Sequence, residues 1–138
     1  MIRKLVQNLA LALAVTGFVG MQTVEAAEAE EPKVIGLMFY SDSCGSCKTL
    51  DPKVKTASKD YAEQPILFVT FDHSNDTTKN QSALLASALD MEKVYGAQKK
   101  ASGFLLLVDP KSGEVISKLT KTMSEDDIKA EFDKALKS

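Results

Sequence analysis

The chain has 138 residues and a formal net charge of −2, from 17 basic and 19 acidic side chains. Its length suits one domain. A weakly acidic chain with scattered lysines lacks the basic surface by which proteins hold nucleic acid, so we expect no nucleic-acid partner.

The first 26 residues have the three parts of a secretory signal peptide. Arg3 and Lys4 precede an apolar stretch over residues 5–19, which is shorter than the roughly 20 residues that a membrane span needs. Small residues then allow cleavage after Ala26, with Ala27 as the next choice. We therefore expect a periplasmic or secreted protein. The alternative is that this stretch is an amphipathic first helix of the domain.

Residues 27–33 are acidic and are expected to form a flexible lead-in to a domain over residues 34–138. Short apolar runs predict buried strands, and a run of alternating polarity predicts a half-exposed one. The four predicted strands are 34–40, 66–72, 104–109 and 114–119. Turn-forming residues over 109–113 predict that the last two pair as an antiparallel hairpin.

Apolar residues at spacings of three and four predict three helices. The first covers 44–62, with Pro52 expected to kink it; the second covers 79–95, with Gly96 as its stop; the third begins at Ser124, which caps it. The expected inner faces are Leu50, Val54, Ala57 and Tyr61; Leu84, Leu85, Ala88, Leu89 and Val94; and Ile128, Phe132, Ala135 and Leu136. The order strand, helix, strand, helix, strand, strand, helix predicts an α/β fold with a mixed sheet between helices.

The two cysteines of the chain, Cys44 and Cys47, lie where the first strand ends and the first helix begins. A cysteine at this junction has its sulfur near unpaired amides and the positive end of the helix, which favour the thiolate. We therefore predict that Cys44 attacks a disulfide and that Cys47, one turn further on, resolves the mixed disulfide. Gly45 and Ser46 between them are expected to tune the reduction potential.

Three other interpretations of the pair stay open. A structural disulfide is one, although a four-residue loop contributes only about 2 kcal/mol in the chain-entropy model. A zinc site is another, but zinc takes four ligands and the chain offers two cysteines and one histidine, His73. Copper bound by two thiolates and His73 is the third. We expect no metal, and we expect His73 to be an ordinary surface residue.

These features resemble the thioredoxin superfamily over about residues 33–137. Phe39-Tyr-Ser-Asp-Ser-Cys-Gly-Ser-Cys-Lys48 is similar to the family's active-site motif, and Pro52 stands at the kink of its active-site helix. Tyr95-Gly96 and the 104–108 run are similar to the segment that enters the family's third main strand. The resemblance implies a thioredoxin-like sandwich and disulfide exchange with protein substrates, without a bound cofactor.

The chain departs from the family pattern at four places. Ser43 replaces the tryptophan before the first cysteine, and Met38 replaces the buried acid. Ser102 or Gly103 occupies the place of the cis-proline, so both are candidate residues of the substrate loop. The stretch between Asp72 and Tyr95 is longer than in the minimal fold, and the family's first strand–helix pair is missing. These changes favour an exported variant with a narrow range of partners.

Two functions compete on this basis. The first is an oxidoreductase that acts on protein thiols and disulfides in an extracytoplasmic compartment, with a membrane electron donor or acceptor as one possible partner. The second is a binding or assembly module, metal-handling in one version, with a redox-idle CxxC. The direction of electron flow does not follow from the sequence, and we expect a monomer.

Overall fold

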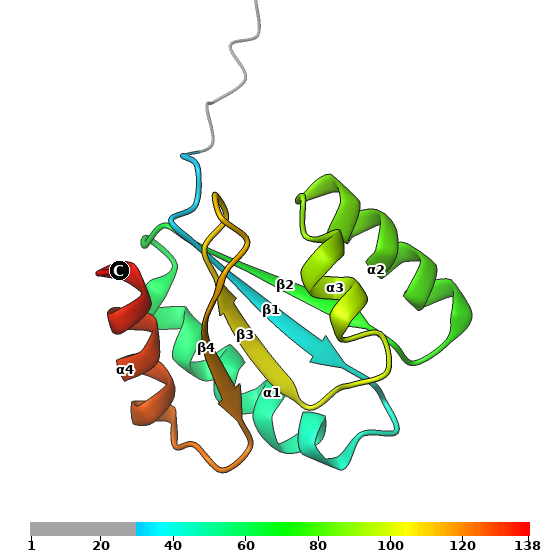
Figure 1. Ribbon diagram of the computed structural model, residues 1–138. Helices are drawn as coiled ribbons and strands as arrows, with labels where there is room; N and C mark the ends of the chain where they lie inside the picture. Colours follow the sequence, from blue (N-terminus) through cyan, green and yellow to red (C-terminus); the bar gives the residue numbers. More distant parts are fainter. Residues whose placement is uncertain (1–29) are drawn as a thin grey trace, which may run out of the picture.

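The computed structural model describes residues 30–138, and a four-stranded mixed sheet lies at their centre (Figure 1). β1 (Val34–Tyr40) pairs in parallel with β2 (Ile66–Asp72) and antiparallel with β3 (Phe104–Val108). β3 in turn pairs antiparallel with β4 (Val115–Thr120), which confirms the predicted hairpin. β1 and β3 are the inner strands, and both are nearly continuous apolar runs because helices cover both faces.

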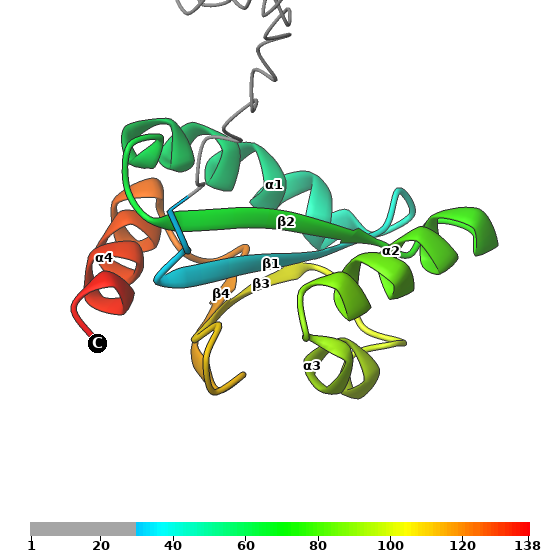
Figure 2. The same cartoon turned by 90° about the horizontal axis from the view of Figure 1, so that it is seen from above.

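Helices cover the sheet on its two sides (Figure 2). One side carries α1 (Gly45–Ser58), the 3-10 helix η1 (Lys59–Tyr61) and α4 (Glu125–Leu136). The other side carries α2 (Asp76–Ala88) and α3 (Glu92–Ala97). The result is the predicted three-layer α/β arrangement of the thioredoxin-like fold.

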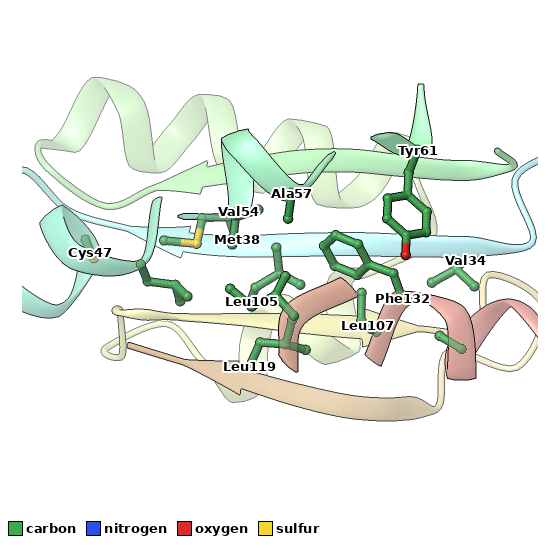
Figure 3. Packing of buried hydrophobic residues seen from close by; sticks show 13 residues of the cluster. Val34, Met38, Cys47, Val54, Ala57, Tyr61, Leu105, Leu107, Leu119 and Phe132 are labelled. Atoms are coloured by element: carbon green, nitrogen blue, oxygen red, sulfur yellow. The ribbon is translucent and has the colours of Figure 1, made fainter. Parts of the chain in front are cut away.

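The core between the sheet and α1 and α4 contains the apolar stripes predicted for these helices (Figure 3). The ring of Tyr61 packs edge-to-face on that of Phe132, with centroids 5.1 Å apart. Cys47 belongs to the same cluster. The other members of the cluster are Val34, Met38, Leu50, Val54, Ala57, Leu105, Leu107, Leu119, Ile128 and Ala135. The active-site helix is therefore held against the sheet along its length.

The helix predicted over residues 79–95 is two helices in the structure. Asn75 caps the first through a reciprocal pair of hydrogen bonds with Thr78, so this helix already begins at Asp76. Asp90 has φ of 57°, in the left-handed region, and this residue interrupts the helical path before α3 begins. The prediction that Gly96 stops the helix is wrong, since Gly96 lies inside α3 and Ala97 ends it.

The inner face predicted for this segment is also largely wrong. Leu84 is 73% exposed and Leu85 is 38% exposed. The buried positions of α2 are Ser82 and Ala86. Ala88 is exposed too, while the predicted contacts of Leu89 and Val94 with the core are present.

Two further features complete the described part of the chain. No helix within residues 30–138 is long and apolar enough to cross a bilayer. The signal peptide predicted over residues 1–26 lies outside the described residues, as do residues 27–29 of the lead-in predicted over 27–33.

Candidate functional site

Cys44 is the N-cap residue of α1. After β1 ends at Tyr40, the chain turns, and the Cys44 amide donates to the Ser41 carbonyl at 3.1 Å. The Cys44 backbone is extended, and its Sγ accepts a hydrogen bond from the Cys47 amide at 3.2 Å. The first turn of α1 carries no acidic side chain. The sulfur therefore meets the positive end of the helix without an opposing negative charge nearby on that turn.

This environment lowers the pKa of the Cys44 thiol. Burial by itself raises that pKa, but hydrogen bonds to the sulfur outweigh it. In order of size, the groups that lower the pKa are the side chains of Cys47 and Ser102 and the backbone amides of Cys47 and Ser46; the Cys47 amide is the one that donates to the sulfur at 3.2 Å. Cys44 remains partly exposed. A thiolate that is both stabilised and accessible is the attacking form of cysteine.

Cys47 has the opposite character. It is fully buried, and its Sγ–H donates to the Phe39 carbonyl oxygen at 3.6 Å. Burial, followed by the interaction with the neighbouring Cys44 sulfur and its charge, raises the pKa of the Cys47 thiol. Met38, which stands in place of the family's buried acid, is buried in the same cluster as Cys47. Cys47 is therefore a protonated, protected thiol until a partner reaches Cys44.

The loop before β3 closes over the cysteine pair. Gly103 has φ of +92°, and its amide donates to the Phe39 carbonyl at 2.8 Å. A Cβ atom at this position would lie 2.7 Å from Ser46 Cβ and 3.1 Å from Cys44 Sγ. Ser102, one residue earlier, has a side chain that contributes to the lowered pKa of Cys44. Both predicted loop residues thus lie at the site. No peptide bond within residues 30–138 is cis, so the loop has no counterpart of a cis-proline.

Gly45 and Ser46 differ in what they contact. Gly45 is exposed, and no heavy atom lies within 4 Å of the place where its Cβ would be. Ser46 lies against Gly103, and its amide contributes to the lowered pKa of Cys44. Of the two residues between the cysteines, the structure thus connects Ser46 directly with the reacting sulfur.

His73 is not the ordinary surface residue that we predicted. Its ring lies edge-on to the rings of Phe39 and Tyr95, at centroid distances of 5.9 and 5.5 Å. Its Nε2 is buried without a hydrogen-bond partner, and burial lowers its pKa. Because β1 and β2 are parallel, His73 just beyond β2 lies at the same end of the sheet as Cys44 just beyond β1. Strand order could have revealed this, but residue type and polarity alone did not.

The copper and zinc interpretations gain no support from this geometry. Within residues 30–138, no three histidine, cysteine or acidic side chains come together as a metal site would require. Cys44 and Cys47 are free thiols one helical turn apart. The arrangement suits thiol–disulfide exchange, with one stabilised thiolate in front of one protected thiol.

Comparison with solved structures gives the same fold in several bacterial proteins. A thiol:disulfide interchange protein from Chlorobium tepidum superposes with a TM-score of 0.51 at 15% identity, covering 75% of this chain and 80% of its own. A thioredoxin domain from Bacteroides vulgatus gives 0.52 at 14% identity, covering 77% and 81%. StoA from Bacillus subtilis gives 0.50 at 16% identity, covering 74% and 84%. No curated protein matches the sequence.

The sequence itself matches a family model. Residues 21–134 match the family described as Thioredoxin, which is most of the chain. The match spans the cysteine pair, the helix that follows it and the hairpin with its final helix. The chain belongs to the thioredoxin family and is a thiol–disulfide oxidoreductase with a CxxC pair.

Proposed function

We propose that this protein exchanges disulfides with exported proteins, with Cys44 as the attacking and Cys47 as the resolving residue. The contrast between the two sulfurs carries the proposal. Cys44 is partly exposed with a lowered pKa, whereas Cys47 is fully buried with a raised pKa. Cys44 is therefore the cysteine that more readily meets a protein disulfide as a thiolate. The signal-like first 26 residues support the exported compartment.

The reaction proceeds through a mixed disulfide. The Cys44 thiolate attacks one sulfur of the substrate disulfide, whose S–S bond breaks and releases one substrate thiolate. Cys47 then loses its proton and attacks Cys44 Sγ, which releases the second substrate thiolate and leaves a Cys44–Cys47 disulfide. The substrate gains two electrons and the pair loses two. The same steps in reverse oxidise a dithiol, and the relative reduction potentials decide the direction.

Two serine variants test the assignment of roles. Cys44→Ser should abolish exchange, while Cys47→Ser should trap substrates as stable mixed disulfides. Ser46→Ala is the matched control, because it changes the intervening residue but leaves both sulfurs. The adducts are measured by non-reducing electrophoresis and mass spectrometry of protein recovered from cells. The mechanism is wrong if Cys47→Ser traps no adduct, or if every adduct it traps is also recovered with Cys44→Ser.

The binding-module alternative has two observations in its favour, which are the absence of a cis-proline before β3 and Met38 in place of the buried acid. An apolar side chain packed in the same cluster as Cys47 supplies no group to take its proton. The reduction potential of the pair separates the two functions, by equilibration with glutathione buffers. A value between about −120 and −270 mV places the pair among working members of the fold. A value well below about −300 mV favours the module.

The compartment is tested on the full chain. Expression in a bacterial host followed by cell fractionation should give a periplasmic protein whose first residue, by mass spectrometry, is Ala27. A chain that stays in the cytosol with Arg3 and Lys4 still attached would contradict export. That outcome would not bear on the roles assigned to Cys44 and Cys47.

A further inference from the structure

Cys44 is the last residue of a short turn between β1 and α1. β1 ends at Tyr40 and α1 begins at Gly45, and the Cys44 amide donates to the Ser41 carbonyl, which closes a turn over residues 41–44. The two central residues of this turn are exposed. Exposed turns are among the more mobile parts of a fold. The position of the attacking cysteine therefore depends on what holds this turn.

A hydrogen bond joins the turn to a segment far along the chain. The Asp42 amide donates to the Ser74 hydroxyl oxygen at 2.9 Å, although the two residues are 32 positions apart in the sequence. The hydrogen bonds within the turn are local, from the Cys44 amide to the Ser41 carbonyl and between the hydroxyls of Ser41 and Ser43. Ser74, just beyond β2, thus fixes the tip of the turn against the neighbouring strand end.

Ser74 is itself held in place by Asp72, the last residue of β2. The Ser74 amide donates to Asp72 Oδ1 at 2.8 Å, and the Ser74 hydroxyl donates to the same oxygen. A hydroxyl that donates to a carboxylate is polarised, which makes it a better acceptor for the Asp42 amide. The amide and carbonyl of Asp72 both hydrogen-bond to the buried Ser82 hydroxyl of α2, at 2.8 and 3.2 Å. A continuous chain of hydrogen bonds therefore runs from α2 to the tip of the turn.

The turn also sets where the Cys44 sulfur meets α1. Cys44 Sγ accepts from the Cys47 amide at 3.2 Å, and this contact contributes to the lowered pKa of Cys44. A hydrogen bond to an anion is strong only while its length and angle are kept. Cys44 lies two residues beyond Asp42, so a displacement of the tip of the turn moves the N-cap residue and weakens this bond.

From this geometry we infer that Ser74 is a positioning residue for the exchange reaction, which holds the turn over residues 41–44 so that the Cys44 sulfur stays in contact with the Cys47 amide. Asp72 supports Ser74 in that place. The inference rests on the proposed role of Cys44 as the attacking thiolate. It assigns Ser74 no contact with either sulfur or with substrate.

Two substitutions at position 74 test this role. Ser74→Ala removes the acceptor of the Asp42 amide, whereas Ser74→Thr keeps a hydroxyl there. We expect Ser74→Ala to raise the pKa of Cys44 and to lower its ratio of thiolate to thiol at a given pH by about threefold to tenfold, which is part of the effect of one charge-assisted hydrogen bond. Ser74→Thr should keep the wild-type ratio.

The readout is the pH profile of iodoacetamide reaction with the reduced protein, with peptide mass spectrometry to identify Cys44 as the modified residue. It needs no substrate, so it fails or succeeds independently of the exchange function. Ser112→Ala is the matched control, because the Ser112 hydroxyl also accepts from a turn amide, that of Glu114 at 3.2 Å, in the β3–β4 hairpin at the opposite end of the sheet. An unchanged Cys44 profile in Ser74→Ala overturns the inference, and so does an equal shift in Ser74→Thr or in Ser112→Ala.

A double-mutant cycle shows whether Ser74 acts through the Asp42 amide. Asp42→Pro removes the hydrogen of that amide, and proline is common at the second residue of a β-turn. In this background Ser74→Ala should leave the Cys44 profile unchanged. A full additional effect of Ser74→Ala in the cycle would show that it acts by another route and would overturn the inference.

One measurement on the wild-type protein needs no variant. Asp42 and Ser43 are both exposed, but the Asp42 amide donates to Ser74, whereas the Ser43 amide has no hydrogen-bond partner within residues 30–138. NMR-detected hydrogen exchange, corrected for intrinsic rates, should show the Asp42 amide protected by about tenfold more than that of Ser43, the scale of one hydrogen bond. Equal protection of the two amides would overturn the inference even if every position-74 variant failed to fold.

Discussion

Gly103 occupies a position where the backbone and its neighbours both exclude a side chain. Its φ is +92°, and an added Cβ would meet Ser46 and Cys44. We expect Gly103→Ala to lower the free energy of unfolding by about 2–5 kcal/mol, from a left-handed backbone cost of about 1–2 kcal/mol and an overpacking cost of about 1–3 kcal/mol. Urea unfolding of the reduced protein measures this loss.

Gly113 is the matched control for Gly103. It also has a positive φ, +71°, but no atom within 4 Å of the place of its Cβ. Gly113→Ala should therefore show only the backbone cost of about 1–2 kcal/mol. Equal losses at the two glycines would show that the contact between Gly103 and Ser46 is not tight.

The sequence predicted the parts of the site that are local in the chain. Cys44 and Cys47 could be assigned because a strand end, a helix start and two thiols follow one another within a few residues. Ser102 and Gly103 came only from the resemblance to a family. The place of His73 depends on contacts with Phe39, Tyr95 and Ala101. Such contacts are set by how the sheet brings distant segments together, which polarity alone does not reveal.

At the level of elements, α2 shows why apolar periodicity was misleading. The buried Ser82 accepts from the Asp72 amide at 2.8 Å and donates to the Asp72 carbonyl at 3.2 Å, which ties the helix to the end of β2. Such short contacts require small residues on the inner face, and Ala86 is the other one. Leu84 and Leu85 of α2 are instead exposed to solvent. A pattern based on hydrophobicity alone ranks leucine above serine and so selects the wrong face.

Substitutions on α2 test the corrected face. Ala86→Leu should lower the free energy of unfolding by about 1–3 kcal/mol, because Ala86 is fully buried and the added volume overpacks its site. Leu84→Ala should change it by less than about 0.5 kcal/mol, because that side chain is 73% exposed. Thermal and urea unfolding measure both. The reverse ranking would restore the face predicted from periodicity.

Tyr61 links η1 to α4 through its hydroxyl. It donates to the Lys129 carbonyl at 3.0 Å or to Asp133 Oδ1 at 2.8 Å. Burial, followed by the bond to Asp133 and the charges of Asp133 and Asp60, raises the pKa of Tyr61 to about 12. The neutral phenol is thus the form that the folded state favours.

The pH dependence of stability follows from that shift. The contribution of Tyr61 is fully present below its ordinary pKa of about 10, and it is lost as the pH rises from there to about 12. Tyr61→Phe should lower the free energy of unfolding by about 1 kcal/mol at neutral pH and flatten its fall over this alkaline range. Urea unfolding at a series of pH values checks both parts. A variant that falls as steeply as the wild type would contradict the shift.

For the whole molecule, the order of elements was predictable because each strand and turn has a local signal. The hairpin of β3 and β4 follows from turn residues, and the place of β1 at the centre follows from its apolar run. The division between α2 and α3 was not predictable. It depends on Asp90 in the left-handed region. Aspartate adopts that conformation more readily than most residues, but an aspartate in a sequence does not by itself predict it.

Oxidation of the cysteine pair connects the site with the stability of the whole fold. Closing a four-residue loop contributes about 2 kcal/mol in the chain-entropy model. The reduced folded protein gains a separate contribution from Cys44, whose lowered pKa favours the folded state above that pKa and no longer does so once the pH falls below it. We therefore expect oxidation to stabilise the fold by about 2 kcal/mol at acidic pH, where Cys44 is protonated in both states, and by less as the pH rises toward the ordinary thiol pKa of 9.0.

Urea unfolding of the oxidised and reduced proteins over a series of pH values below 9.0 measures this difference. Cys44→Ser with Cys47→Ser provides the baseline without either thiol. A gap that stays constant with pH would mean that Cys44 titrates alike in the folded and unfolded chains. The low folded-state pKa would then be wrong.

The Phe39 carbonyl accepts from two groups, the Gly103 amide at 2.8 Å and the Cys47 thiol at 3.6 Å. Once Cys47 enters a disulfide it has no proton to donate, and of these two donors only the Gly103 amide remains. The Gly103 amide proton should then move downfield in the NMR spectrum. The chain has no tryptophan whose fluorescence could follow the redox state. The Gly103 amide signal would therefore report whether the Cys44–Cys47 pair is oxidised or reduced.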